Sequence, residues 1–316
     1  MAQQLTNNKV EQTLKYSSWY IFFHSLTIGL GEKFIEAFAF FLKASNLQFS
    51  LLTPLSQFFG STIQLFTYRL LSIFKSRKLM NIVLIVIQGL VWIPIFLLAL
   101  QRREEVVWFY MLMVLIYYCC AFLINPIWNS WMMDLVLPEQ RGKFYGKRHV
   151  IINSVVLLSY LLGGAALHYS QRTFMTESYG FMLLFGLAAA GNLLAATMLL
   201  KKHEPEYTIV KPKTSLKKFM MSMRQDNQGR IVLYLVLMTI AVYIASPFYT
   251  PYILRSLNFS YIEFTILMLI PVIPKILFSK KAGKLIDKYG PKTMLKLASI
   301  LIVFTPLLWI LNKSFW

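Results

Sequence analysis

The stretch that decides the fold is Gly283-Lys-Leu-Ile-Asp287-Lys-Tyr-Gly290-Pro-Lys292, a short segment punctuated by glycine and rich in cations. Long apolar runs flank it on both sides. An apolar helix needs about 20 residues to cross the ~30 Å hydrocarbon core of a bilayer, and each of these runs is near that length. A connection this short therefore joins two neighbouring antiparallel helices that both cross a membrane.

The composition of the whole chain is typical of a polytopic membrane protein. Hydrophobic residues make up 57% of the 316 residues, charged residues only 14%, and the mean hydropathy is +0.56. A soluble domain of this length does not have that composition. The net charge of +19 does not indicate nucleic-acid binding, because the basic residues are concentrated in alternate loops, which is a topology signal.

The sequence contains no motif for a cofactor, a metal or hydrolytic catalysis. It has no Walker loop, no G-x-S-x-G elbow, no H-E-x-x-H and no cluster of cysteine and histidine. Cys119 and Cys120 are adjacent within an apolar run, a spacing that fits neither a metal site nor a redox pair. We therefore expect no enzyme activity, no cofactor and no metal.

Nine membrane spans are predicted, and one long polar linker divides them. The spans lie near 17–44, 48–73, 79–100, 106–134, 149–168, 179–200, 231–253, 261–279 and 294–312. We expect a six-helix bundle over 1–200, a basic linker over 201–230 and a three-helix part over 231–316. Apolar residues recur at helical spacing within the linker, which is equally consistent with an amphipathic surface helix and with a solvated segment.

The distribution of lysine and arginine predicts the orientation. Alternate loops, beginning with the one around Arg77, carry most of the basic residues, and the other loops carry few. Loops rich in lysine and arginine stay on the cytoplasmic side of a membrane. We therefore expect a multi-pass protein of the cell (inner) membrane, in contact with membrane lipid, with its N-terminus in the cytoplasm.

Two motifs resemble the signature loops of the major facilitator superfamily, a large group of secondary transporters. The pattern G-x-L-x-D-x-x-G-x-K begins at Gly283, and a pattern of an acid, six residues and Arg-Gly begins at Asp134. The preceding Trp128-Asn-Ser-Trp131 and the following Gly-x-Arg, which ends at Arg148, resemble an uncharacterised bacterial branch of that family. The resemblance implies an all-α bundle of two six-helix halves that carries a small-molecule substrate by alternating access.

The resemblance also implies gating roles for residues of these two loops. They are Asp134, Arg141, Gly142, Arg148, Gly283, Asp287, Gly290 and Lys292. We expect Arg141 to reach back to Asp134, whose carboxylate is poorly placed at the C-terminal end of a helix dipole, and Asp287 to face the start of the fifth span. Each pair is consistent with a latch between two states of a bundle, or with an ordinary surface ion pair of about 0–1 kcal/mol.

A short internal repeat supports two related halves. When the chain is shifted by 215 residues (283 minus 68), residues 68–80 fall on 283–295, and apolar or basic residues coincide at several positions. Only three spans follow the linker, whereas the resemblance implies six. Three more spans need on the order of 90 residues, so we expect the sequence to be truncated at its C-terminus.

The first span carries Glu32, Lys33 and Glu36 near its middle. A charge at the bilayer centre costs about 2.5–3.5 kcal/mol on insertion scales, so such charges usually line a cavity and serve function. Glu32 and Glu36 share one helical face, and their repulsion would favour proton uptake by one of them. Neutralisation of both by Lys33 and a neighbouring helix is the equally plausible structural alternative.

A second polar stripe lies on the second span, where Gln57, Ser61, Gln64 and Tyr68 share a helical face. Such a stripe either lines a pore or binds a neighbouring helix. Our leading hypothesis is a secondary transporter whose solute cavity is lined by Glu32, Glu36, Gln57, Ser61 and Gln64. Coupling of this transport to protons is part of the hypothesis. The alternatives are a truncated membrane protein that does not transport, and a lipid-modifying membrane enzyme that uses Glu32 and Glu36 as acid and base.

Overall fold

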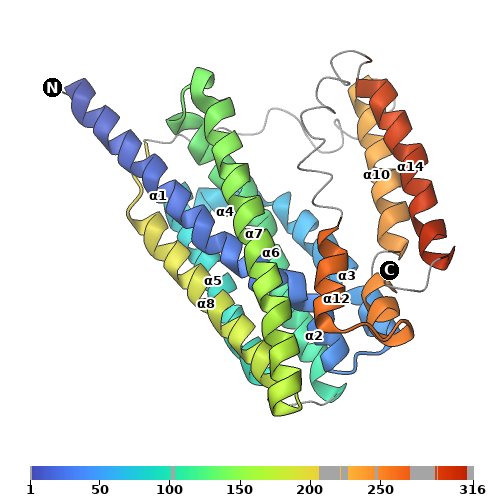
Figure 1. Ribbon diagram of the computed structural model, residues 1–316. Helices are drawn as coiled ribbons and strands as arrows, with labels where there is room; N and C mark the ends of the chain where they lie inside the picture. The colour runs from blue at the N-terminus through green and yellow to red at the C-terminus, as the bar shows by residue number, and fades with distance from the viewer. Residues whose placement is uncertain are drawn as a thin grey trace. The chain divides into compact units, whose positions relative to one another are not determined.

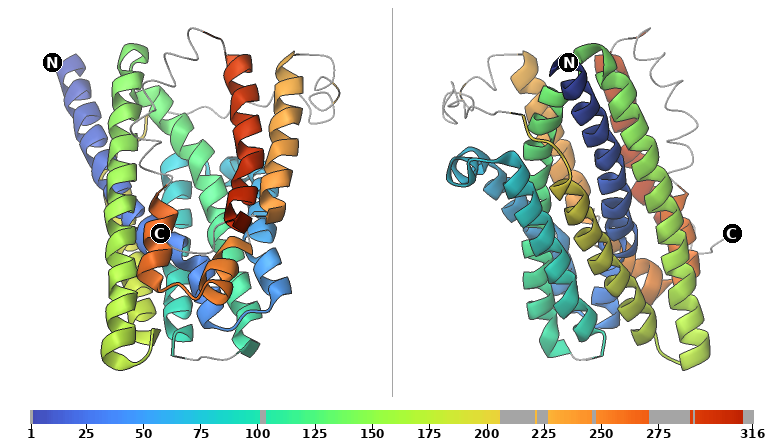
Figure 2. Two further views of the ribbon diagram at one scale, coloured as in Figure 1. Left: turned by 45° about the vertical axis from the view of Figure 1, so that its right-hand side comes forward. Right: turned by 90° about the vertical axis from the view of Figure 1, so that its left-hand side faces the viewer.

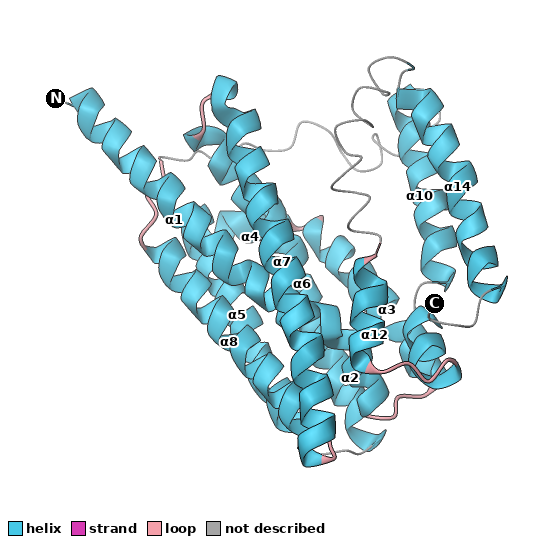
Figure 3. Ribbon diagram, in the orientation of Figure 1, coloured by secondary structure: helices cyan, strands magenta, loops and turns pink. Residues whose placement is uncertain are grey.

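The computed structural model describes residues 2–100, 104–205, 221, 227–245, 248–270, 289 and 291–311. Every regular element in this part of the chain is a helix, as Figure 3 shows. Five of the helices are long and apolar enough to cross a membrane. The predicted all-α polytopic membrane fold is confirmed.

The chain divides into two compact units, Met1–Met221 and Ser222–Trp316. The boundary falls within the predicted linker, 201–230, most of which lies outside the described residues, including its proposed amphipathic segment. The division into a six-helix part, a linker and a three-helix part stays a prediction.

The first unit contains most of the described helices (Figure 1). They are α1 (Ala2–Leu30), η1 (Glu32–Phe34), α2 (Ile35–Phe41), α3 (Asn46–Gln64), α4 (Thr67–Phe74), α5 (Arg77–Leu98), η2 (Glu104–Val106), α6 (Val107–Leu135), α7 (Pro138–Phe174) and α8 (Ser178–Leu200). Helix α1 packs beside α7 and α8, α5 beside α6 and α8, and α3 beside α6. Figure 2 shows these long helices running side by side from two further directions.

Buried aromatic and aliphatic side chains hold these helices together. One cluster joins Tyr20 of α1, Ile85 of α5, Trp128 and Trp131 of α6, and Leu199 of α8. A fully buried side chain of this kind contributes about 1.5–3 kcal/mol in water, but lipid is as apolar as the core, so close packing matters more within a membrane.

The first predicted span, 17–44, is broken in the structure. Helix α1 ends at Leu30, Gly31 forms a turn, and η1 carries Glu32 and Lys33 before α2 begins. A Cβ atom at Gly31 would lie 2.6 Å from the Trp92 ring, so only glycine allows the chain to turn this close to α5. The break places the charged residues on a short 3₁₀ turn instead of a continuous helix.

The loop predicted between the fourth and fifth spans is mostly helical. Helix α7 begins at Pro138, where a proline at the first helical position loses no intrahelical bond. It continues through the predicted start of the fifth span near residue 149 and ends at Phe174. Arg141, Gly142 and Arg148 therefore lie on the first turns of a helix and not on a loop.

The second unit contains α10 (Asn227–Ala245), α11 (Tyr249–Pro251), η4 (Tyr252–Ser256), α12 (Tyr261–Leu269) and α14 (Pro291–Leu311). Helix α12 begins with a capping box, in which Ser260 accepts from the backbone N–H of Glu263 and the Glu263 carboxylate accepts from Ser260. The predicted span 261–279 extends from this helix beyond the described residues.

Candidate functional site

A cavity of about 330 Å³ lies within the first unit, between α1, η1, α6 and α7. Its wall combines aliphatic, aromatic and polar side chains. The lining residues are Tyr20, Ile21, His24, Ile28, Glu32, Tyr117, Tyr118, Ala121, Phe122, Ile124, Asn125, Trp128, Arg148 and Ile152. Ligand pockets typically have volumes of about 300–1,000 Å³ and a few convergent polar groups, so this cavity can accept a small molecule.

One end of the cavity is formed by Arg148, Trp128 and Tyr20. The guanidinium carbon of Arg148 lies 4.2 Å from the centroid of the Trp128 ring, a cation–π contact. The Tyr20 ring stacks on Trp128 with centroids 6.4 Å apart. Within the described part of the chain, the buried Nε of Arg148 and Nε1 of Trp128 have no hydrogen-bond partner. Two donors at this end are therefore free to bind an acceptor.

His24 lines the middle of the cavity, one turn of α1 beyond Tyr20. Its Nδ1 lies 3.0 Å from Oδ1 of Asn192 on α8. Because an amide oxygen can only accept, the ring N–H donates, and Nε2 is left as the acceptor of the neutral ring. His24 was not singled out in the sequence as a site residue.

Glu32 marks the other polar end. Tyr117 donates its hydroxyl to Glu32 Oε2 at 2.9 Å, and the Tyr117 ring packs against Trp92 with centroids 5.1 Å apart. Tyr117 and Trp128 are separated by three turns of α6, or roughly 16 Å at 1.5 Å per residue. The cavity is thus elongated, with a carboxylate near one end and a guanidinium near the other.

The other predicted cavity residues do not line this space. Thr53 of α3 donates to Glu36 Oε1 at 3.3 Å, so Glu36 contacts a neighbouring helix. Ser61 donates to the Phe58 carbonyl at 2.9 Å on the same helix, α3. Gln57 and Gln64 are partly exposed on α3. A solute-lining role for these four side chains stays a prediction.

Sequence spacing could have found the missed residues. Tyr20, His24 and Ile28 of α1 and Glu32 of η1 follow one another at intervals of four in the sequence, the same signal that identified the stripe on α3. The two tyrosines of α6, Tyr117 and Tyr118, carry no comparable signal, because aromatic residues are frequent along that helix.

Asp134 takes a different arginine from the one expected. Its Oδ2 lies 2.5 Å from Nη1 of Arg77, the first residue of α5, whose side chain is fully buried. Arg77 Nη1 also donates to the carbonyl and the hydroxyl of Ser130, at 3.1 and 3.2 Å. Glu204 lies beside the same guanidinium, with Oε1 3.8 Å from Nε.

Glu204 also caps the start of α5. The backbone N–H groups of Arg77 and Lys78 donate to its Oε1 at 2.6 and 3.2 Å, and Ser76 donates to its Oε2 at 2.6 Å. A carboxylate at this position satisfies free N–H groups and the positive end of the helix dipole. Arg77, Asp134 and Glu204 together form what we call the charge network.

The Arg141 side chain binds main-chain carbonyls at the end of α6. Its guanidinium donates to the carbonyls of Met133, at 2.8 Å, and Val136, at 3.2 Å. Because only two residues separate the end of α6 from the start of α7, the Arg141 side chain can reach these last carbonyls and donate to them. The expected contact between Arg141 and Asp134 is replaced by the contact between Arg77 and Asp134.

The remaining predicted gating residues are Gly142, Gly283, Asp287, Gly290 and Lys292. Gly283, Asp287 and Gly290 lie outside the described residues. Lys292 is exposed near the start of α14 in the second unit. Gly142 is part of the first turns of α7.

Lys202, two residues beyond the end of α8, is a buried cation. Its Nζ lies 4.2 Å from the Trp131 ring centroid and 5.4 Å from that of Trp128. Burial holds the pKa of the Lys202 ammonium well below its usual range, and the cations of Arg148 and Lys78 lower it further. Among the residues that the structure describes, aromatic rings and not carboxylates lie beside this charge.

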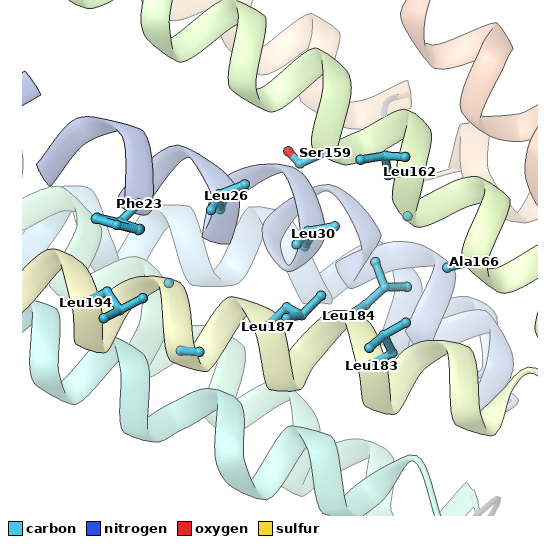
Figure 4. A pocket seen from close by; sticks show the side chains of 13 residues that line it. Phe23, Leu26, Leu30, Ser159, Leu162, Ala166, Leu183, Leu184, Leu187 and Leu194 are labelled. Carbon is cyan, nitrogen blue, oxygen red and sulfur yellow. The ribbon is translucent and has the colours of Figure 1, made fainter. Parts of the chain in front are cut away.

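A second cavity, of about 360 Å³, lies between α1, α7 and α8 (Figure 4). Leucines from all three helices line it, among them Leu30, Leu162 and Leu187. Ser159 is the hydroxyl on this wall, and it donates to the carbonyls of its own helix at 2.6 and 3.2 Å. This cavity offers little to orient a polar solute, in contrast to the cavity of Arg148 and Glu32.

Among the described residues, no group of three histidine, cysteine, aspartate or glutamate side chains is placed to hold a metal ion. Comparison with known proteins found one family model, described as Major Facilitator Superfamily, which matches residues 12–316. No curated protein and no solved structure matches the chain.

Proposed function

The chain belongs to the Major Facilitator Superfamily, a family of membrane transporters that are typically not enzymes, and we propose that it is a secondary transporter of a small solute. In this proposal the cavity of Arg148 and Glu32 holds the solute and is exposed alternately to the two sides of the membrane. A gradient of protons or of the solute supplies the energy. The N-terminus faces the cytoplasm of a cell (inner) membrane, as the basic loops predict.

The observation that carries the proposal is a carboxylate inside a solute-sized cavity of a membrane helix bundle. Glu32 lines this cavity and accepts a hydrogen bond from Tyr117. An ionisable residue at membrane depth is costly and usually belongs to a solute or proton pathway. In the proposal Glu32 takes up a proton when the cavity is open to one side and releases it when the cavity is open to the other.

The charge network, which lies at the C-terminal end of α6, supports the proposal of a latch there. Asp134 is half exposed, whereas Arg77 is fully buried, so the pair can open by hydration of the carboxylate alone. Glu204 connects the same arginine to the segment that follows α8. We propose that this network closes in one state of the transporter and opens in the other, which is the gating role predicted for Asp134.

Solute-dependent proton movement tests the function without knowledge of the substrate. Inside-out membrane vesicles that contain the full chain and a pH-sensitive dye are exposed to a panel of small solutes. At least one solute should change the internal pH in wild-type vesicles and not in vesicles without the protein. Glu32→Gln should abolish the proton movement but preserve exchange of labelled solute for unlabelled solute.

Two matched variants separate the cavity carboxylate from a general effect of charge. Glu36→Gln removes the neighbouring carboxylate that contacts Thr53, and Glu105→Gln removes an exposed one on η2. Both should retain proton movement. Loss of proton movement in Glu105→Gln, or its persistence in Glu32→Gln, would show that Glu32 is not the coupling group.

A further inference from the structure

Two cations share one tryptophan ring at the end of the proposed solute cavity. Arg148 lies 4.2 Å from the Trp128 centroid, and Lys202 lies 5.4 Å from it. Like charges repel, and burial strengthens the repulsion because little water is present to screen it. Placing both cations here costs free energy unless something negative binds between or beside them.

Within the described chain, that negative group is not a protein carboxylate. Neither Arg148 nor Lys202 forms an ion pair with a described carboxylate, and the carboxylates of Asp134 and Glu204 lie beside Arg77. Lys202 has a sulfur acceptor, Met132 Sδ at 3.6 Å, which carries no charge. The positive charge of this end of the cavity is therefore uncompensated by the described side chains.

Two buried donors at the same end also lack an acceptor. They are Nε of Arg148 and Nε1 of Trp128, and both residues line the cavity. Most buried donors in a folded protein have an acceptor, so two unsatisfied donors that both belong to the lining of one cavity favour a ligand with acceptor atoms. A carboxylate, phosphate or sulfonate provides both the acceptor atoms and the negative charge.

The rest of the wall defines the body of this ligand. Beyond Arg148 the cavity is lined mainly by aliphatic and aromatic side chains such as Ile28 and Phe122, and the uncharged polar groups of His24 and Asn125 interrupt them. Glu32, the carboxylate on this wall, lies toward the other end, far enough from Arg148 not to neutralise it. The wall suits a flat or elongated apolar body that has a single anionic head.

We propose that the cavity binds a small organic anion, whose anionic head contacts Arg148 and Trp128 and whose apolar body lies against Phe122 and Ile28. This inference rests on the proposed function, because it names the substrate class of the same cavity. Lys202 does not line the cavity, but its Nζ lies 5.4 Å from the Trp128 ring centroid, close enough to attract the anionic head. Arg148 is thus a ligand-binding residue, and Lys202 strengthens its field.

Equilibrium binding tests the substrate class independently of transport. Isothermal titration calorimetry on the full chain in an uncharged detergent compares cinnamate, cinnamyl alcohol and cinnamylamine, which share one apolar body and differ in charge. Cinnamate should bind more tightly than the other two. Arg148→Gln should weaken cinnamate binding roughly tenfold to hundredfold, because a charge-assisted pair of hydrogen bonds is lost. Arg148→Lys, which keeps the charge, should retain part of the affinity.

Control variants make the result specific. Arg172→Gln removes an exposed arginine from the far end of α7 and should leave cinnamate binding unchanged. Equal binding of the alcohol or the amine, absence of cinnamate binding, or an Arg148→Gln variant that folds and binds normally would each overturn the proposal. Competition by phosphatidylglycerol, but not by phosphatidylcholine, would assign the site to a lipid headgroup and overturn a free solute. Cinnamate binding without any proton movement in vesicles would leave this inference standing and contradict the transport mechanism.

Discussion

The charge network allows a quantitative test of whether a described ion pair stabilises the first unit. The perturbation is a double-mutant cycle with Asp134→Asn, Arg77→Met and the combined variant. Arg77 Nη1 and Asp134 Oδ2 are 2.5 Å apart, with the arginine side chain 0% and the aspartate side chain 50% exposed. The cycle isolates the energy of this pair from the other losses that each single change causes.

The exposure of the two partners sets the expected magnitude. Breaking a fully buried pair costs about 3–5 kcal/mol, and an exposed pair contributes about 0–1 kcal/mol. Water reaches Asp134 but not Arg77, so the coupling energy should lie between these limits, at about 1–3 kcal/mol. Asp134→Asn alone should be the costly single change, since it leaves the buried cation with less compensation.

The free energy of unfolding of each variant is measured on the full chain in mixed micelles. The fraction of sodium dodecyl sulfate is increased, and tryptophan fluorescence monitors the unfolding. Trp131 lies one helical turn before Asp134 and reports on this region. A parallel cycle with Arg69→Met, which removes an exposed arginine of α4, should be additive with Asp134→Asn. A coupling energy below about 0.5 kcal/mol for Arg77 and Asp134 would refute the reasoning and reduce the pair to an ordinary surface contact.

Two further predictions concern packing and pH. Lys202→Met should raise the free energy of unfolding at neutral pH by about 1–3 kcal/mol, because it removes a buried cation. In the wild type the free energy of unfolding should rise with pH between the lowered pKa of folded Lys202 and about 10.4, because the unfolded state binds more protons in that range. The same micelle titration of Lys202→Met should lack this rise. Gly29→Ala should destabilise by about 1–3 kcal/mol, because its Cβ would lie 1.9 Å from Ser159 Oγ, whereas Gly146→Ala, with no atom within 4 Å, should be neutral or stabilising by less than 1 kcal/mol. An unchanged pH profile in Lys202→Met, or equal unfolding midpoints for the two alanine variants, would contradict these expectations.

The helical architecture could be predicted because it is written in local apolar runs. Runs such as 79–100 and 179–200 agree with α5 and α8 within two residues at either end. The break at Gly31 could not be predicted, since it depends on the distance to Trp92, more than 60 residues away in the chain. The early start of α7 could have been predicted from the sequence, because a proline such as Pro138 is a recognised signal for the first turn of a helix.

The partners of charged residues were harder to predict than the charges. Asp134 and Arg141 are seven residues apart, and proximity in sequence favoured pairing them. The structure instead brings Arg77 to Asp134 because α5 packs along α6, a contact that no short motif encodes. Glu32 was found from its charge alone, but its bond to Tyr117 again required the packing of two helices.

The aromatic pair Trp128 and Trp131 shows why the candidate site exceeded what sequence reasoning could supply. In the sequence these residues served only as a mark of family resemblance. In the structure Trp128 contacts the half-buried Arg148 and Trp131 contacts the buried Lys202, and neither cation is paired with a carboxylate of the described residues. A charged site is usually predicted from an acid and a base at a suitable spacing, and a cation that contacts an aromatic ring has no such acidic partner in the sequence. The use of a ring in place of a carboxylate has a functional consequence. A carboxylate beside Arg148 would neutralise it, whereas the Trp128 ring leaves the positive charge available to a ligand in the cavity.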